Sequence, residues 1–454
     1  MRFILLLSLS LTFRLTVSGQ KTLRIEGKIA NFPPQLLVLS QYFGGQLMPI
    51  DTTASNLEGK FVFEEKDSVQ AGLFRIVGIG RGLDLVVSES FDFSLEADAR
   101  DVIGTIRFSN APDNALLFDY QRKVRARYQP LLQYRQQAGI KDDNDPRWRS
   151  RFEAFNLTMK SFTDSLYAAH PQWFVTRFLK SFQEPQLPVL PVKTLSAKDS
   201  LYLKNYAWQH TFDNAFLSDE RMLYTAHFST RVGRFVKNIP ALSVEELKQT
   251  MDKIIPQTNG TKELRKYLVG QLASRLETTA EPHLDALYEH IVKNYVETDP
   301  ALWDASTLQK VREMREIRAK MAIGKVFPDL KMTDIEGKPK ALGDLEAEHT
   351  LLFFYDPGCS HCRETAPKLT DFVKRNPNSV SVYAVSLDAN EDTWRQFIKD
   401  FQTESFANVR DAERKTDFYK LGVWNYPAMY LLDRDKKIVA RWLTVEELER
   451  YFSR

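Results

Sequence analysis

The sequence predicts a multidomain protein with three folded regions of different class. Residues 20–109 show period-2 alternation and are expected to be all-β and sandwich-like, residues 110–322 carry apolar side chains at helical spacing and are expected to be all-α, and residues 323–454 alternate strands with helices as an α/β domain does. A chain of 454 residues is also longer than one hydrophobic core usually serves. Both cysteines of the chain lie in the third region, three residues apart.

The first residues predict a signal peptide at positions 1–19. Arg2 precedes an apolar run from Phe3 to Phe13, and small residues follow near Ser18, so cleavage is expected before Gln20. No later stretch is long and apolar enough for a transmembrane helix. No cysteine lies near the cleavage site, so we expect an exported, soluble protein of the periplasm or cell envelope without a lipid anchor.

Residues 20–109 contain short alternating runs that are separated by Gly, Asn and Asp. This pattern predicts an antiparallel sheet folded as a small sandwich or barrel. The region contains neither a titratable cluster nor a Gly-rich phosphate loop, so we expect an accessory role. The predicted strands are LRIEGKIA, LLVLSQYF, GKFVFEEK, GLFRIVGI, LDLVVSE, FDFSLEA and GTIRFS.

Residues 110–322 carry apolar residues three and four positions apart, which indicates amphipathic helices. A proline-rich break at 184–192 separates two helical groups, and Ser218 is predicted to be the N-cap of the helix that follows it. The seven histidines of the chain show no paired-ligand spacing, so no metal site is predicted. Because 62 basic and 59 acidic side chains nearly cancel, no nucleic-acid partner is expected either.

The third region is predicted to form an α/β sheet in which a parallel crossover is followed by an antiparallel edge. A hairpin turns at Glu336-Gly337, and the buried strand TLLFFY leads directly into the cysteines. The remaining expected elements are a helix from Cys362 to about Lys374, a strand at 379–388, a helix at 391–401, a helix in AERKTDFYKLGV that ends at Gly422, paired strands at 427–433 and 437–442, and a last helix in VEELERYFS.

A strand that runs into the sequence Cys-x-x-Cys at the start of a helix suggests thiol–disulfide exchange. The unsatisfied N–H groups and the dipole of the helix favour an anion at Cys359, which is therefore the predicted nucleophile. Cys362, one turn further on, is placed to attack the resulting mixed disulfide. A zinc site lacks two further ligands, and a structural disulfide across so short a loop would constrain the unfolded chain little.

Residues 324–454 resemble the thioredoxin-fold domains of the TlpA/ResA type, which are envelope thiol–disulfide oxidoreductases. The resemblance rests on the lead-in FPDLKMTDIEGK, the strand LLFFY, the motif CSHC, Pro367, the strand VYAVSLD, and Tyr426-Pro427 before MYLLD. It implies that Pro427 follows a cis peptide bond and faces the disulfide. The backbone of Tyr426 would then lie beside the sulfurs and pair with an extended substrate chain.

The sequence departs from that family at the positions that control proton transfer. Thioredoxins keep a buried Asp six residues before the first cysteine, where this chain has Phe353, and an aromatic residue directly before it, where this chain has Gly358. TlpA-type domains often have a Glu three residues after the second cysteine, where Thr365 stands here. The proton acceptor is therefore open, with Glu364 and Asp356 as the candidates.

The two residues between the cysteines, Ser360 and His361, are expected to tune the thiols. A cationic His361 beside Cys359 stabilises the thiolate and makes the disulfide more oxidising, whereas the acidic residues near the motif act in the opposite direction. The sequence therefore leaves the redox direction open.

The primary hypothesis is an exported oxidoreductase that acts on protein thiols and disulfides, more as a reductase or isomerase than as an oxidase. It needs no cofactor beyond the redox-active disulfide Cys359–Cys362; its electron donor is not identified, and the helical region is a candidate for homo-oligomer formation. The alternative is a binding or scaffold protein of the envelope, whose accessory domains recognise a ligand or partner. Peroxidase action is disfavoured because no Thr-x-x-Cys arrangement is present.

Overall fold

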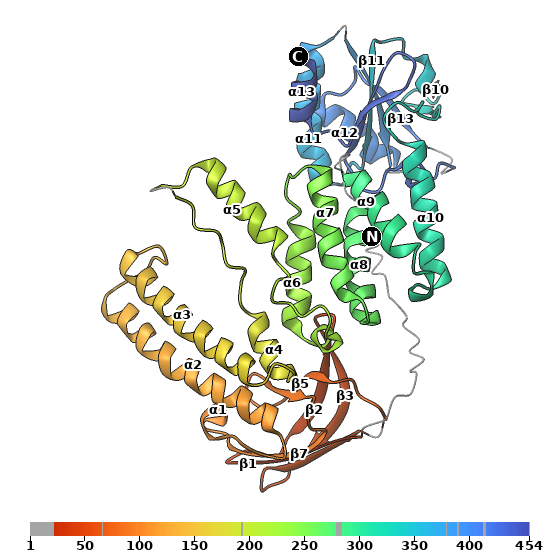
Figure 1. The fold of residues 1–454 in the computed structure, drawn as a ribbon. Helices are drawn as coiled ribbons and strands as arrows, with labels where there is room; N and C mark the ends of the chain where they lie inside the picture. The colour runs from red at the N-terminus through yellow and green to blue at the C-terminus, as the bar shows by residue number, and fades with distance from the viewer. Residues whose placement is uncertain are drawn as a thin grey trace. The chain divides into compact units, whose positions relative to one another are not determined.

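The computed structural model describes residues 22–453 except 66, 192–193, 278–283, 378, 388–389 and 412–414. The chain divides into two compact units (Figure 1). The first unit comprises Met1–Pro240 and Gln257–Arg265, and the second comprises Ala241–Pro256 and Lys266–Arg454. The expected signal peptide at 1–19 lies outside the described residues and stays a prediction, as do the boundaries of the three regions.

The first unit begins with β-strands, which among the described residues form two four-stranded sheets of order β4-β1-β7-β8 and β3-β2-β5-β6. The sheets are not purely antiparallel, because β1 pairs with β7 in parallel. Strand β3 was not expected; its side chains are mostly exposed, so it lacks the apolar alternation that marks its neighbours. The strands are β1 Leu23–Ala30, β2 Leu36–Phe43, β3 Gln46–Ala54, β4 Lys60–Glu65, β5 Gly72–Val77, β6 Leu83–Val87, β7 Asp92–Asp98 and β8 Arg107–Ser109.

Helices make up most of the rest of the first unit (Figure 1). The two longest, α2 and α3, pack against each other through a small apolar cluster that contains Leu131, Ile140 and Trp148. The helices are α1 Val102–Thr105, α2 Pro112–Gln137, α3 Pro146–Ala169, α4 Phe174–Ser181, α5 Ala197–Gln209, the 3-10 helix η1 Glu220–Tyr224 and α6 Ala226–Lys237.

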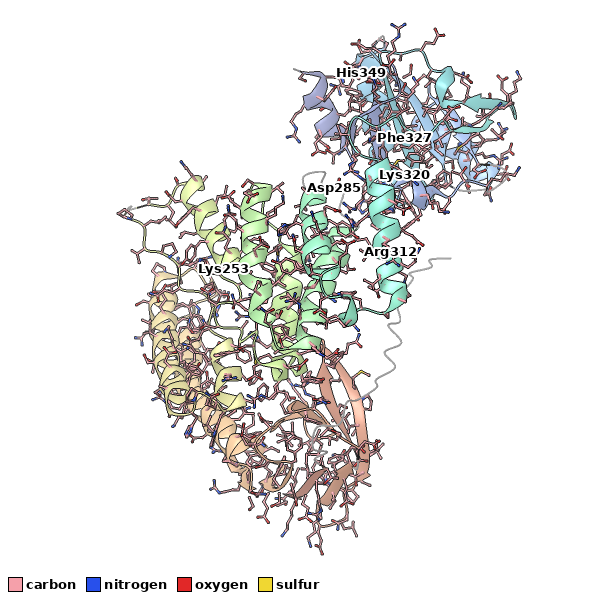
Figure 2. The ribbon with its side chains drawn as sticks, turned by 45° about the vertical axis from the view of Figure 1, so that its right-hand side comes forward. Lys253, Asp285, Arg312, Lys320, Phe327 and His349 are labelled. Atoms are coloured by element: carbon pink, nitrogen blue, oxygen red, sulfur yellow. The ribbon has the colours of Figure 1, made fainter. Side chains whose placement is uncertain are left out.

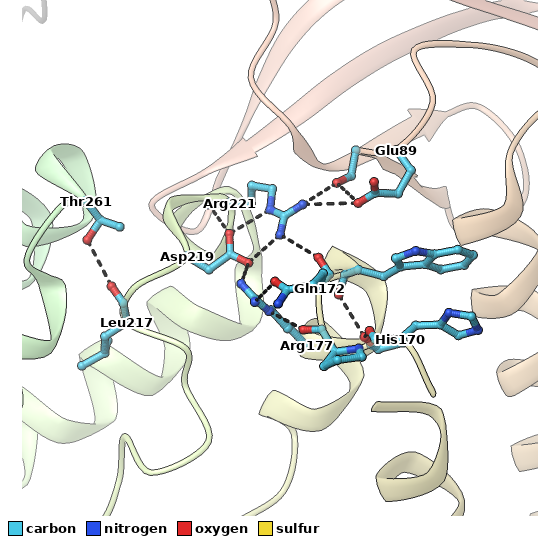
Figure 3. Close-up of polar contacts among 12 residues, drawn as sticks. Glu89, His170, Gln172, Arg177, Leu217, Asp219, Arg221 and Thr261 are labelled. Carbon is cyan, nitrogen blue, oxygen red and sulfur yellow. Dashed lines mark hydrogen bonds and ion pairs between the residues drawn. The ribbon is translucent and has the colours of Figure 1, made fainter. Parts of the chain in front are cut away.

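A buried ionic network joins the strands and helices of this unit (Figure 3). Asp219 accepts hydrogen bonds from Arg177 at 2.9 Å and from Arg221 at 2.7 Å. Arg221 also donates to the hydroxyl of Ser88, which follows strand β6, at 2.9 Å. Asp219 is only 6% exposed, so loss of either arginine would leave a buried charge short of a partner.

The helix start predicted at Ser218 is wrong. Asp219, not Ser218, is the N-cap, since its side chain accepts from the backbone N–H of Arg221. The segment that follows is the short 3-10 helix η1 rather than an α-helix, and Thr225 caps the next helix, α6.

The second unit combines helices with the C-terminal α/β domain (Figure 2). Helix α8 enters this unit from the segment Gln257–Arg265, and α9 continues into the π-helical turn η4. The helical elements before the sheet are α7 Val244–Ile254, η2 Ile255–Thr258, α8 Lys262–Glu277, α9 Asp285–Ile291, η4 Val292–Val296, η5 Pro300–Leu302 and α10 Ala305–Lys320.

The C-terminal sheet has the order β10-β9-β13-β12-β11-β14-β15. Strands β11, β12 and β13 run parallel, while β14 and β15 form the expected antiparallel edge. The strands are β9 Lys331–Asp334, β10 Pro339–Ala341, β11 His349–Tyr355, β12 Val380–Ser386, β13 Ala407–Arg410, β14 Ala428–Leu432 and β15 Ile438–Arg441, and the helices are η6 Leu342–Asp344, α11 Ser360–Arg375, α12 Glu391–Phe401, η7 Phe418–Leu421 and α13 Val445–Phe452.

Both faces of this sheet are covered, which explains why its central strands read as continuous apolar runs. One core includes Leu351 and Phe353 of β11 together with residues of α11, α12 and α13. The other includes Leu352 and Phe354 of the same strand. Helix α10 contributes to this second core through Ile317, and Met321 directly after the helix does the same.

Two predictions for this region are wrong. The helix expected in AERKTDFYKLGV is, within the part that the structure describes, only the 3-10 helix η7, although its predicted end at Gly422, which adopts the left-handed conformation, is confirmed. The connecting stretch before it contains strand β13, which pairs with β12 in parallel. The hairpin turn and the helices α11, α12 and α13 lie where the sequence predicts them.

Among the residues that the structure describes, no helix combines the length and the apolar character that crossing a bilayer requires.

Candidate active site at the start of helix α11

Both cysteines lie at the point where the buried strand β11 passes into helix α11. A tight turn connects the two elements: the Cys359 N–H donates to the backbone carbonyl of Asp356 at 3.0 Å, and the Asp356 side chain accepts from the N–H of Gly358 at 2.7 Å. Because β11 is an inner strand, paired with β12 on one side and β14 on the other, this turn is held at a fixed place at its carboxyl end.

Cys359 is the N-cap residue of α11 and is partly exposed. Its carbonyl accepts the first helical hydrogen bond, from Arg363 at 3.1 Å, so its thiol lies beside the unpaired N–H groups of the first turn. The helix has 16 residues, and its dipole favours a negative charge at this end. An accessible thiol in such a position is suited to act as a nucleophile.

Cys362 lies in a different environment. Its side chain is 0% exposed and belongs to the core that also contains Phe353 and Tyr355. Burial raises the pKa of the Cys362 thiol well above its ordinary range, and the neighbouring Cys359 raises it further. Cys362 therefore keeps its proton near neutral pH and needs an acceptor before it can attack.

The loop before β14 brings Tyr426 and Pro427 to the cysteines. The peptide bond between these two residues is cis, as the family resemblance implied. The Cys359 thiol lies 3.8 Å from the carbonyl oxygen of Tyr426, and the Tyr426 side chain is 46% exposed. A backbone carbonyl is thus available beside the accessible sulfur, where an extended chain could pair with it.

The two candidate proton acceptors differ in position. Glu364 is exposed and lies 3.6 Å from Nδ1 of His361, whose side chain is 78% exposed, so this pair faces solvent. Asp356 lies in the turn itself, where its charge contributes to the raised pKa values of Cys362 and Tyr426 after the larger effect of burial. Of the two carboxylates, Asp356 is the one whose charge acts on Cys362. Ser360 is exposed at the first position of the helix.

Two other residues near the site carry no signal in the sequence. Tyr355, at the end of β11, is buried against Phe397, with 4.4 Å between the ring centroids, and interacts electrostatically with Cys362. Trp424 precedes Tyr426 by two residues, and its ring stacks on Trp442 at 5.4 Å. In sequence, Tyr355 is simply the last residue of an apolar strand, and nothing marks Trp424 as more than an ordinary aromatic. Among the described residues, no cluster of His, Cys, Asp and Glu is suited to bind a metal ion.

Comparison with known proteins concerns this domain. Residues 323–441 match the AhpC/TSA family. A thiol-disulfide oxidoreductase ResA of Bacillus cereus is 28% identical over 141 residues, which cover 30% of this chain and 80% of the relative. A thioredoxin-like protein, YneN, of Bacillus subtilis is 24% identical over 136 residues, which cover 28% of this chain and 76% of the relative.

Among solved structures, a domain of a possible thiol-disulfide isomerase from Cytophaga hutchinsonii is 34% identical and covers 29% of this chain and 91% of its own, with a TM-score of 0.28. The matches to the family and to ResA confirm the resemblance that the motifs indicated. The C-terminal region is a thioredoxin-like domain related to thiol-disulfide oxidoreductases of the ResA type.

Proposed function

We propose, from the thioredoxin-like domain that residues 323–441 form, that this chain is an exported thiol–disulfide oxidoreductase that reduces or isomerises protein disulfides. One observation carries the proposal. An accessible thiol, Cys359, caps a helix beside the Tyr426 carbonyl, while a second thiol, Cys362, lies buried one turn further on.

The reaction follows from this asymmetry. The Cys359 thiolate attacks one sulfur of a substrate disulfide, forms a mixed disulfide, and releases the other substrate sulfur as a thiolate that takes up a proton. The Cys362 thiolate then attacks the Cys359 sulfur and releases the second substrate thiol. The substrate has gained two electrons and two protons, and the protein holds the Cys359–Cys362 disulfide. A dithiol donor restores the two thiols by the same exchange in reverse.

The second step needs a base, because Cys362 is protonated near neutral pH. Asp356 is the carboxylate in the turn beside the sulfurs, and we assign the acceptor role to it. Phe353 occupies the position of the buried aspartate of thioredoxins, and because its ring has no titratable group it takes no part in proton transfer. His361 and Ser360 tune the thiols from the exposed side of the first helical turn.

A protein substrate fits the site better than a small disulfide does. The Tyr426 carbonyl offers a hydrogen-bond acceptor to an extended backbone, and the exposed Tyr426 ring offers an apolar contact. The chemistry needs no cofactor besides the redox-active disulfide. Export to the periplasm or cell envelope rests on the sequence of residues 1–19. A binding or scaffold role is not favoured, because both thiols occupy positions suited to exchange.

The test is reduction of a model protein disulfide by the full chain with a dithiol donor. Cys359→Ser should abolish turnover. The matched variant Cys362→Ser should also lose turnover but should form a stable mixed disulfide through Cys359. Turnover by Cys359→Ser at the parent rate would refute the proposal.

A further inference from the structure

We propose that Arg318 of helix α10 is a positioning residue for substrate binding: it braces the loop that carries Tyr426, and so sets the orientation in which Tyr426 meets a protein substrate. The inference rests on the proposed function, since it concerns how the same site receives its substrate.

Arg318 is held by the neighbouring helices through both terminal nitrogens of its guanidinium group. One nitrogen donates to the carbonyls of Leu276 at 2.6 Å and Glu277 at 2.8 Å, the last carbonyls of α8, which have no partner within their helix. The other nitrogen donates to Asp285 at the start of α9. The guanidinium also lies over the ring of Tyr288 at 4.5 Å. With the side chain 7% exposed, these contacts fix the guanidinium plane.

The same guanidinium contacts the α/β domain at Trp424. It lies 5.1 Å from the centroid of the indole ring, a distance at which a cation is attracted to an aromatic face. The indole N–H donates to the carbonyl of Tyr419 at 3.2 Å, and the ring stacks on Trp442. Trp424 is separated from Tyr426 by one residue, so Arg318 acts on the loop very close to the cysteines.

The loop is anchored to the helices at two further points. The side chains of Tyr419 and Glu277 form a hydrogen bond. Gly422, with a φ of +72°, packs so closely that an added Cβ would lie 3.4 Å from Met321 Cγ and 2.7 Å from the hydroxyl of Tyr430. The segment from Tyr419 to Trp424 is therefore held in part by residues from outside the sheet domain, and Tyr426 lies two residues beyond it.

A buried ion pair fixes the helices to the sheet at the same place. Asp285, which Figure 2 shows at the start of α9, pairs with Arg318 and also with Arg441 of β15. Arg441 is 4% exposed and donates to the carbonyl of Met321 at 3.2 Å. Because Asp285 joins both arginines, a shift of α10 would be transmitted to the loop rather than absorbed by free movement of one side chain.

The contacts of Arg318 affect the binding of a protein substrate more than they affect the thiol–disulfide exchange reaction. The Cys359 thiol is positioned by α11 and by the turn at Asp356, neither of which Arg318 contacts. The Tyr426 carbonyl, by contrast, depends on the loop for its direction. A protein substrate must pair with that carbonyl, whereas a small aromatic disulfide reaches Cys359 without it.

The experiment compares Arg318→Met with Arg315→Met in the full chain. Arg315 lies on the same helix one turn earlier and bonds to Glu289 and Glu297, so it matches Arg318 in charge and helix but does not contact the loop. For a model protein disulfide we expect Arg318→Met to raise KM at least fivefold with kcat within twofold. Activity on the small disulfide should be unchanged, and Arg315→Met should resemble the parent on both substrates.

A second variant approaches the same contact from the loop. Trp424→Leu removes the ring and leaves the bonds of Arg318 to α8 and α9 intact. It therefore tests the contact between Arg318 and the loop even if Arg318→Met fails to fold. It should raise KM for the protein substrate by a similar factor. The double variant should be no worse than either single one, since both remove one interaction. A parent-like KM in folded Trp424→Leu, or an additive double variant, would overturn the inference.

A failure of the proposed function can be distinguished from a failure of the inference that Arg318 positions the loop. If the parent reduces no disulfide, the proposed function is lost, and amide hydrogen exchange of residues 423–426 then decides about the brace alone. Faster exchange there in Arg318→Met than in Arg315→Met would support it, and equal exchange in the two variants would overturn it.

Discussion

The two thiols should differ sharply in their reaction with an alkylating reagent. A thiol with the ordinary pKa of 9.0 is about 1% thiolate at pH 7. Each further unit by which the pKa rises lowers that fraction tenfold. Burial raises the pKa of Cys362 and removes its sulfur from solvent, whereas Cys359 is accessible at a helix N-terminus. We therefore expect Cys362 to react with iodoacetamide at least about ten times more slowly than Cys359.

The assay is mass spectrometry of the reduced, native chain after brief alkylation, with the urea-unfolded chain as the control. In urea both thiols should react at similar rates. The pH dependence has a definite sign: because Cys362 holds its proton more tightly when folded, the free energy of unfolding should fall as the pH rises above about 9, where the unfolded thiol ionises. Equal labelling of the two cysteines in the native chain, or faster labelling of Cys362, would refute this account.

Three further predictions concern the surroundings of the thiols. Met321→Ala should lower the free energy of unfolding by about 2–5 kcal/mol in urea titrations, because Met321 lies in the core of the sheet domain, while Ile323→Ala, at a 58% exposed position, should cost about 0.5 kcal/mol or less. Asp356→Asn should slow release of the mixed disulfide in quenched-flow experiments by about tenfold or more, and more than Glu364→Gln does; the reverse order would contradict the assignment of the acceptor. His361→Ala should lower the reduction potential by less than about 30 mV, since the imidazole is exposed and faces Glu364, and a rise would show that the imidazole does not favour the thiolate.

The elements around the cysteines could be predicted because their signals are local. The apolar run before Cys359, the helix after it and the hairpin at Glu336-Gly337 each follow from neighbouring residues. The cis bond before Pro427 and its place beside the sulfur came from the family resemblance, since nothing in the local pattern connects positions 67 residues apart.

What the sequence did not indicate depends on contacts between distant segments. The residues after Asp411 have good helix propensity, but the described part of the stretch forms only one 3-10 turn, whose Phe418 and Leu421 pack against the core of the sheet domain. The parallel pairing of β1 with β7 leaves no mark in either strand. An apolar stripe on α10 predicts a buried face but does not say that the face completes the core of the sheet domain.

The reduction potential of the Cys359–Cys362 pair, measured by equilibration with glutathione, tests the central claim most directly. We predict a reversible two-electron transition in the parent, with a potential closer to about –270 mV, as in thioredoxin, than to about –120 mV, as in a dedicated oxidase. The absence of a reversible disulfide between these two residues would contradict the claim of an exchange enzyme. A potential near –120 mV would contradict the assignment as a reductase or isomerase.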